Sequence, residues 1–178
     1  MKKILLFILF FPALLHAQVY TPVDSRSEIK IIIKNVGMDT EGRMSGLQGT
    51  IHFNPAELKS ASFDMSIDAA SINTDIEPRD KTLKEAEYLN TAQYPRISFL
   101  SKQLSRLPGN NRYLMKGDIT IKGITREISF PFSALPKDGG LQFSGEMKLN
   151  RKDFRIGTGS VVLSEGFTVM LQVFARPA

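Results

Sequence analysis

The side chains that could carry acid–base chemistry are few in this chain, and their spacing does not group them. His52 is the only histidine beyond residue 17; because it alternates with Ile51 and Phe53, we expect it to face outward from a strand without a catalytic partner. Asp64 and Asp68 share one face of a predicted strand and could mimic paired acids, but the serines around them indicate a solvated face. The pattern predicts a protein that is not an enzyme.

Cysteine is absent from the chain, which removes several further kinds of site. A protein without cysteine has no disulfide framework, no thiol nucleophile and no thiolate ligand for a transition metal. Glycines are frequent, but none forms a phosphate-binding loop ahead of a helix. We therefore expect no metal site and no required cofactor.

The charge pattern argues against a nucleic-acid partner. The formal net charge is +5 at pH 7, and it falls to +3 when residues 1–17 are left out. A nucleic-acid-binding surface normally shows a stripe of basic residues, whereas those of this chain are dispersed. The densest basic group is interpreted as the solvated end of a strand: Lys148, Arg151, Lys152 and Arg155.

Residues 1–17 have the layout of a signal peptide. Two lysines precede an apolar run from Ile4 to Leu15, and the small residue Ala17 follows. The run is shorter than the roughly 20 apolar residues that a membrane-spanning helix needs, and no later segment is long enough. We predict cleavage after Ala17, a mature domain of residues 18–178 without a transmembrane segment, and a periplasmic or secreted location.

Alternation of apolar and polar residues recurs along the mature chain and predicts a mainly β fold. It is cleanest over residues 59–68, and turn signals such as Pro108–Asn111 and Asp138–Gly140 separate the alternating runs. Residues 18–27 and 37–42 lack alternation and are interpreted as irregular. About eight strands result, which favours an antiparallel meander with one solvated face. Such a sheet must pack on a second sheet or close on itself, and an eight-stranded barrel can hold one small ligand.

One stretch, residues 74–99, interrupts the alternation and predicts a short helical insertion. Thr74 and Glu77 have the spacing of a capping box, and Pro78 suits the first helical residue. Pro95 disfavours helix just before it. Two ion pairs at i,i+4 spacing would support the helix: Asp80 with Lys84, and Lys81 with Glu85. We expect the insertion to border or close one end of the barrel.

The apolar sides of the predicted strands would all face one interior. Alternation by itself favours a packed core over a ligand cavity. Many inward residues are Phe or Met, however, which suit an adaptable apolar site, and Gly117 and Gly145 in the same rows would leave room. Both interpretations stay open on this pattern. The inward residues that would line a cavity are Phe63, Met65, Ile67, Ile97, Phe99, Met115, Ile119, Phe130, Phe132, Phe143, Met147, Phe167, Val169 and Leu171.

Four short sequence motifs are informative when they are taken together and in their order along the chain. They are Gly49–Phe53 with Asn54-Pro55; Arg79-Asp80-Lys81 leading to Tyr94-Pro95 and Ile97-Ser98-Phe99; Lys116–Thr125; and Arg151-Lys152-Asp153-Phe154 with Ile156. Together they resemble the signature of the YceI-like family of exported, lipocalin-like polyisoprenoid-binding proteins. The resemblance covers nearly the whole mature chain.

The resemblance implies an eight-stranded antiparallel lipocalin-like barrel with a short helical insertion. It also implies an apolar lumen for a polyisoprenoid, an isoprenoid quinone or a similar fatty-chain lipid, which the fourteen inward residues would line. A ligand-free structural or interaction module of the cell envelope remains the alternative, and a homodimer stays open. Family members often carry histidines near the first strand, where this chain has Arg26-Ser27 and Asn35. Head-group contacts by histidine are therefore not implied.

Overall fold

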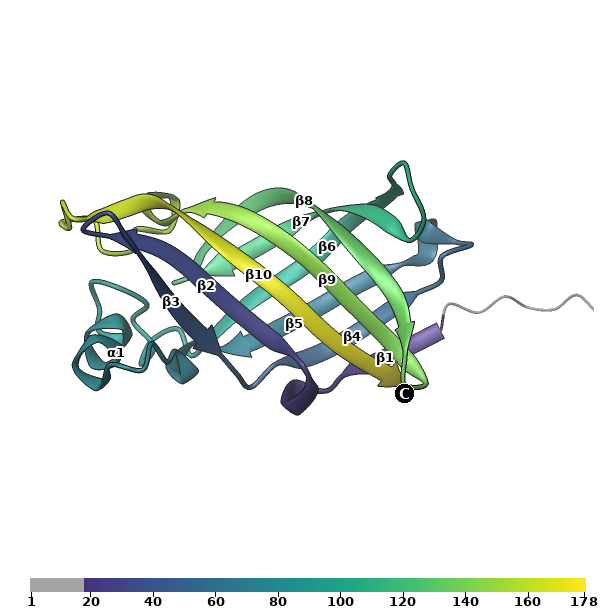
Figure 1. Ribbon diagram of the computed structural model, residues 1–178, viewed down its shortest axis with the longest axis horizontal. Coiled ribbons are helices and arrows are strands. Elements are labelled where there is room, and N and C mark those ends of the chain that lie inside the picture. Colours follow the sequence, from purple (N-terminus) through teal and green to yellow (C-terminus); the bar gives the residue numbers. More distant parts are fainter. Residues whose placement is uncertain (1–17) are drawn as a thin grey trace, which may run out of the picture.

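The computed structural model describes residues 18–178, and the predicted signal peptide lies outside the described residues. Within them the chain is mainly β, with one α-helix (Figure 1). The strands are β1 (Gln18–Pro22), β2 (Glu28–Asn35), β3 (Met38–Met44), β4 (Gln48–Phe53), β5 (Ser62–Asp68), β6 (Arg96–Arg106), β7 (Arg112–Ile121), β8 (Ile124–Lys137), β9 (Gly140–Asn150) and β10 (Leu163–Pro177). The helix is α1 (Glu77–Lys84), and four short 3₁₀ helices are η1 (Asp24–Arg26), η2 (Leu58–Ser60), η3 (Ala69–Ser71) and η4 (Arg151–Phe154).

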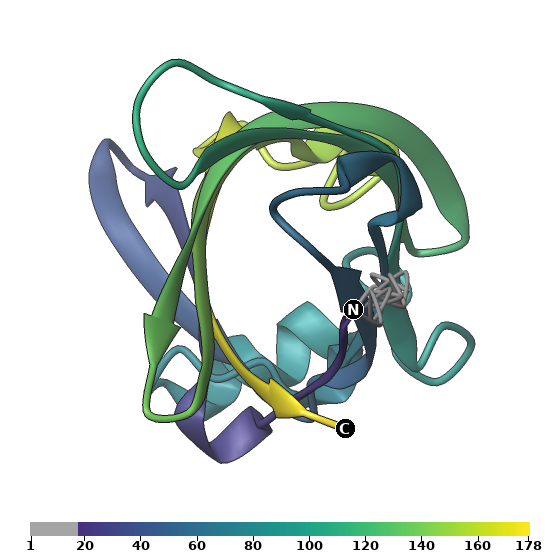
Figure 2. The ribbon, with the colours of Figure 1, turned by 90° about the vertical axis from the view of Figure 1, so that its right-hand side faces the viewer.

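Eight of these strands close into an antiparallel barrel. β1 pairs with β4 on one side and with the end of β10 on the other, so β1 and β4–β10 form an unbroken ring (Figure 2). The long strand β10 makes this possible because residues 163–172 pair with β2 while residues 175–177 pair with β1. The β2–β3 hairpin therefore continues the wall over the other half of the barrel.

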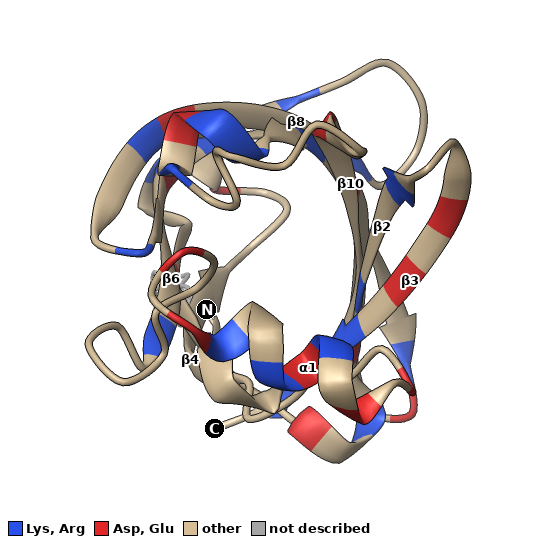
Figure 3. Ribbon diagram, turned by 90° about the vertical axis from the view of Figure 1, so that its left-hand side faces the viewer, with Lys and Arg blue, Asp and Glu red and all other residues tan. Residues whose placement is uncertain are grey.

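The helical insertion lies where the wall is least complete. β3 pairs along its length with β2, but within residues 18–178 its other edge makes a single bridge, from Arg43 to Asn73. The chain between β5 and β6 contains η3 and α1, and it borders this end of the barrel next to β3 (Figure 3). The insertion thus takes a place in the wall that a strand occupies elsewhere in the ring.

The helix forms where the sequence predicts it, but its supporting contacts differ. α1 begins at Glu77, and among the described residues no side chain caps its N-terminus. Thr74 instead donates from its backbone N and its Oγ1 to Asp80 Oδ1, at 2.9 and 2.5 Å, so the capping-box prediction was wrong. The ion pair on the helix joins Lys81 to Glu77 at 3.0 Å, and the two predicted pairs do not form within the described residues.

β1 and β3 lie where the sequence predicts irregular chain. β1 has five residues, too few for an alternating pattern to stand out. β3 has charged residues on one face and only Met38 and Met44 as apolar side chains on the other, and Gly42 is its only buried residue. Backbone pairing with neighbouring strands builds both elements, and that pairing does not depend on side-chain type. Alternation of apolar and polar residues is therefore weak over both segments.

Aromatic side chains fill the half of the barrel nearest β1 and β4. The Phe53 ring lies 5.3 Å from Tyr113 and 5.5 Å from Phe143, at interplanar angles of 88° and 86°. Phe63 and Phe132 complete the group, in which the Phe63 and Phe132 rings are 5.8 Å apart. Edge-to-face contacts of this kind are favourable and leave little space between rings. We call these five residues the aromatic cluster and this part of the barrel the filled half.

Candidate functional site

The other half of the barrel contains a cavity of about 280 Å³. This volume is close to the lower end of the roughly 300–1,000 Å³ that is typical of small-molecule pockets. Side chains from β2–β10 and the insertion line the cavity, and Phe63, Phe132 and Phe143 of the aromatic cluster form its floor. We call this part of the barrel the hollow half.

All fourteen inward residues that the sequence nominates line this cavity: Phe63, Met65, Ile67, Ile97, Phe99, Met115, Ile119, Phe130, Phe132, Phe143, Met147, Phe167, Val169 and Leu171. Met65, Ile97 and Leu171 are only half-buried although they face the interior. An inward side chain stays accessible when no atoms stand opposite to it, so these rows border a space. That the fourteen residues contact a lipid stays a prediction.

The cavity has further lining residues that alternation did not nominate. They include residues of β2 (Ile29, Ile31 and Ile33), the last residue of β3 and the bend after it (Met44 and Leu47), and residues of the insertion (Ile72, Leu83, Tyr88 and Leu89). The β2 row is visible in the sequence as one face of a strand, but its place depends on the pairing of β2 with β10. The insertion residues have no strand periodicity, so only tertiary packing directs them toward the barrel.

The two glycines expected to leave room behave differently. Gly145 lines the cavity. A Cβ at Gly117, however, would lie 2.6 Å from Phe99 Cζ and 2.5 Å from the carbonyl oxygen of Leu100. The space beside Gly117 is thus occupied by the Phe99 ring, and the prediction that this glycine leaves room was wrong. Its function is to let an aromatic side chain on the neighbouring strand lie across the backbone.

Arg151 is buried at the edge of the cavity, whereas the sequence predicts a solvated strand end. Its side chain is 2% exposed. All five of its N–H groups donate to backbone carbonyl oxygens: Nε to Ser164 at 2.9 Å, Nη1 to Ile156 at 2.9 Å and to Gly157, and Nη2 to Ser160 at 3.0 Å and Leu163 at 2.8 Å. Arg151 therefore holds the loop between η4 and β10 in one conformation. Only the family-like phrase around residue 151 marked it as special.

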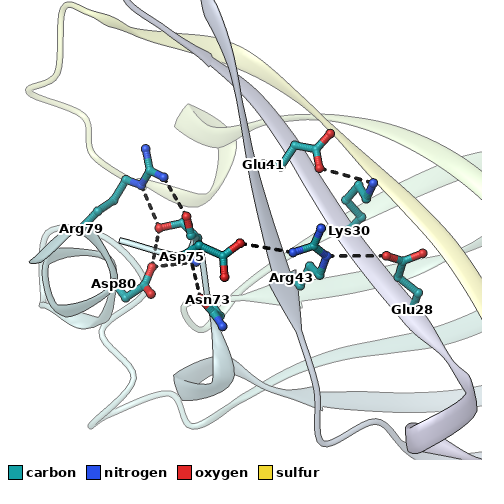
Figure 4. A network of polar contacts seen from close by, with 9 residues as sticks. Glu28, Lys30, Glu41, Arg43, Asn73, Asp75, Arg79 and Asp80 are labelled. Carbon is teal, nitrogen blue, oxygen red and sulfur yellow. Dashed lines mark hydrogen bonds and ion pairs between the residues drawn. The ribbon is translucent and has the colours of Figure 1, made fainter. Parts of the chain in front are cut away.

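Arg79 and Thr74 form a polar edge of the cavity beside the insertion (Figure 4). Arg79 Nε donates to Thr74 Oγ1 at 2.8 Å, and Nη2 donates to the Thr74 carbonyl oxygen at 2.9 Å. Because Thr74 also donates to Asp80 of α1, the three residues anchor the insertion. Asp75 pairs with Arg43 of β3 at 3.4 Å and joins this segment to the wall. Within residues 18–178 no carboxylate lies within ion-pair distance of Arg79.

A lysine connects the insertion with the loop that Arg151 holds. Lys122 Nζ donates to the carbonyl oxygens of Glu87 at 3.0 Å and Arg155 at 2.8 Å. Partial burial lowers the pKa of the Lys122 ammonium below its ordinary value. Gly157 N also donates to Glu87 O, at 2.9 Å. The segments that surround the rim of the hollow half are therefore connected to one another by hydrogen bonds.

Buried polar side chains of the described part of the chain all have hydrogen-bond partners within it. No buried side-chain nitrogen or oxygen in residues 18–178 lacks a hydrogen-bond partner, and no group of three or more His, Cys, Asp or Glu in that range could hold a metal ion. His52 is half-buried on β4, between the buried Ile51 and Phe53. Asp68 Oδ1 accepts from Ala70 N at 2.8 Å and so caps η3.

Whether any helix of the described residues could span a bilayer depends on its length and its apolar character. No helix in residues 18–178 combines the length and the apolar character that crossing a membrane requires.

Comparison with known proteins places this barrel in a family. The sequence profile of the YceI-like domain matches residues 20–175. The chain belongs to the YceI-like family. Protein YceI of Escherichia coli O157:H7 is 27% identical over 138 residues, which cover 74% of this chain and 71% of that relative. The resemblance inferred from the four phrases is thereby confirmed.

Solved structures share the fold of this YceI-like barrel. BcnA of Burkholderia cenocepacia has a TM-score of 0.82 at 21% identity, covering 87% of this chain and 99% of that chain. A polyisoprenoid-binding domain of Saccharophagus degradans has a TM-score of 0.72 at 15% identity, covering 92% and 99%. At such identities the likeness concerns the fold, and the predicted eight-stranded barrel with a short helical insertion is confirmed.

Proposed function

We propose that this YceI-like protein binds the chain of a polyisoprenoid, an isoprenoid quinone or a similar long-chain lipid in the hollow half. The observation that carries the proposal is the cavity itself, whose wall is built from aliphatic and aromatic side chains of nine strands and the insertion. Membership of the YceI-like family and the fold shared with a polyisoprenoid-binding domain support it.

The physical basis of binding would be burial of hydrocarbon. Each CH₂ group that leaves water contributes roughly 0.8 kcal/mol, so a long chain needs few polar contacts. The wall is suited to such a ligand because the described residues leave no buried polar side chain unpaired, and an apolar ligand would therefore break no hydrogen bond. The polar head would lie at the rim, where Arg79, Thr74 and Asn35 line the cavity.

The place of action is part of the same proposal. The signal-peptide layout of residues 1–17 supports export, and we infer a periplasmic or secreted protein that stores or transports its lipid outside the cytoplasm. Within this proposal the protein acts by sequestration and not by catalysis.

Extraction with organic solvent followed by mass spectrometry tests the proposal. The purified protein is expected to carry a long-chain lipid in near-stoichiometric amount. A Leu171→Trp variant should carry at least about fivefold less, because the indole would occupy the cavity. Met170→Trp is the matched control: Met170 is the next residue of β10, faces outward and is exposed, so its lipid content should stay normal.

Two results would contradict lipid binding. One is repeated absence of lipid from the unaltered protein after expression in a lipid-producing host and after incubation with polyprenols. The other is equal lipid content in both tryptophan variants, which would place the lipid outside the cavity. Either result would favour the alternative, a structural or interaction module without ligand.

A further inference from the structure

Four exposed aliphatic side chains project together at the end of the hollow half. Val36 and Met38, at the β2–β3 turn, are 69% and 71% exposed; Val161 and Val162, in the loop before β10, are 97% and 54% exposed. Val36 N donates to Val162 O at 3.0 Å, so the two segments lie side by side. Both extend beyond the barrel wall at the same end (Figure 1). We call these four residues the apolar tip.

The backbone at Val36 is unfavourable for a valine. Val36 has φ = 51° and Gly37 has φ = 78°, which are the left-handed conformations of a two-residue hairpin turn that favours Asn-Gly. A β-branched residue is strongly disfavoured there, and this valine is also exposed to solvent. Neither local conformation nor burial accounts for an aliphatic side chain at this position. Strained backbone of this kind clusters at functional sites.

The two segments that form the apolar tip contain no charged side chain. Residues 156–164 contain no charged side chain, and none occurs from Val36 to Met38. Basic and acidic residues are mixed around the rest of this end (Figure 3), so no strong single-sign field surrounds the tip. A partner that covers the tip would therefore be recognised by its apolar character and not by its charge.

We propose that the apolar tip inserts into the interfacial region of a lipid bilayer and so holds the hollow half against the membrane. Four aliphatic side chains on projecting loops can enter a deformable apolar phase. A specific protein partner would need about 800 Å² of complementary surface on each side and commonly an aromatic or arginine anchor, and the tip contains neither residue type. The inference concerns the outer surface and goes beyond the proposed binding of a lipid in the cavity.

Vesicle flotation measures this association directly. The experiment uses protein that starts at residue 18, so that the apolar run of residues 4–15 does not contribute to membrane binding. This protein is expected to float with phosphatidylcholine vesicles, with little change when phosphatidylglycerol or salt is added. The double variant Val161→Ser, Val162→Ser should lower the partition coefficient at least about tenfold, which corresponds to about 1.4 kcal/mol.

A matched control removes two exposed aliphatic side chains from elsewhere on the barrel. Leu100 and Leu135 are 54% and 48% exposed on β6 and β8, and the double variant Leu100→Ser, Leu135→Ser should float like the unaltered protein. Val36→Asn is a second test, because asparagine suits the left-handed turn. This variant should fold at least as stably and yet float about threefold less, which separates membrane contact from folding.

Insertion can also be observed by fluorescence, since the chain contains no tryptophan. In a Val161→Trp variant, emission should shift to shorter wavelength when phosphatidylcholine vesicles are added. A Leu135→Trp variant places the same reporter on the wall and should show no shift. Equal shifts at both positions would contradict docking through the apolar tip.

Three further results would contradict membrane insertion by the apolar tip. Absence of flotation by the unaltered protein would overturn the proposal, as would equal loss in the tip and control variants. Concentration-dependent dimerisation in sedimentation experiments, abolished by the tip substitutions and unaffected by vesicles, would assign the tip to a second copy of the chain. The cavity proposal is judged separately, since lipid recovered by extraction should stay normal in all tip variants.

Discussion

The filled and hollow halves share strands β5–β10, yet they differ in what occupies the interior. β5 illustrates this: Phe63 is buried in the aromatic cluster, whereas Met65, one inward step along, is half-buried and borders the cavity. In the filled half, rings from five strands meet edge to face. In the hollow half, the opposing side chains are mainly aliphatic, and the β2–β3 hairpin and the insertion replace part of the ring. An uninterrupted inward row can therefore be core at one end and cavity wall at the other.

The largest expected effect compares two phenylalanines, one in each half. Phe53→Ala should lower the free energy of unfolding by about 3–5 kcal/mol, because it leaves an internal void among packed rings. Phe167→Ala should lower it by less than about 2 kcal/mol, because that half-buried ring already borders a space. Urea denaturation measures both. Equal losses would mean that the hollow half is packed as tightly as the filled half.

The next effect concerns the buried arginine at the rim. Arg151→Met should cost about 3 kcal/mol, because several loop carbonyl oxygens lose their donors inside the protein. Lys152→Met is the control, since Lys152 is exposed and pairs with Glu165 at the surface, where such a pair contributes at most about 1 kcal/mol. Hydrogen exchange should show faster exchange of residues 157–163 in the Arg151 variant alone. Similar exchange in both variants would contradict the role given to Arg151.

A third comparison concerns two substitutions on β10, each of which places a larger side chain in one half of the barrel. Ala175 is fully buried on β10, and Ala175→Leu should cost about 1–3 kcal/mol through overpacking. Leu171→Trp, two inward steps away, should cost less than about 1 kcal/mol, because the cavity accepts the larger ring. Thermal unfolding of the two variants tests this. A larger loss for Leu171→Trp would show that the cavity collapses onto its own side chains.

The smallest expected effect comes from exchanging valine and asparagine between two left-handed turn positions at opposite ends of the barrel. Val36→Asn should stabilise the protein by about 1 kcal/mol by relieving backbone strain. Asn111 has φ = 57°, and Asn111→Val should destabilise the protein by a similar amount, about 1 kcal/mol. Denaturant midpoints would report both changes. A loss of stability in Val36→Asn would mean that contacts of the Val36 side chain outweigh the strain.

Much of the barrel follows from local pattern because strand alternation is a local property. The rows containing Phe63, Met115 and Phe143 were assigned to the interior from the sequence, and they lie there. β1 and β3 escaped prediction because main-chain pairing builds them, while β1 is only five residues long and Gly42 is the only buried residue of β3. The charge of Arg151 likewise predicted a solvent-exposed side chain. A sequence does not show that backbone carbonyl oxygens from a later loop will surround its guanidinium group.

The sequence by itself determined the β class, the single helical insertion, the family and the inward rows, because each depends on residue periodicity or on a contiguous phrase. Only the tertiary structure decided where those rows pack and where they surround a space. That outcome depends on which side chains stand opposite one another across the barrel, and on the division of β10 between β1 and β2. It also decided that Val36 and Val162 meet at one end, because their segments are far apart in the chain and are brought together by the pairing of β2 with β10.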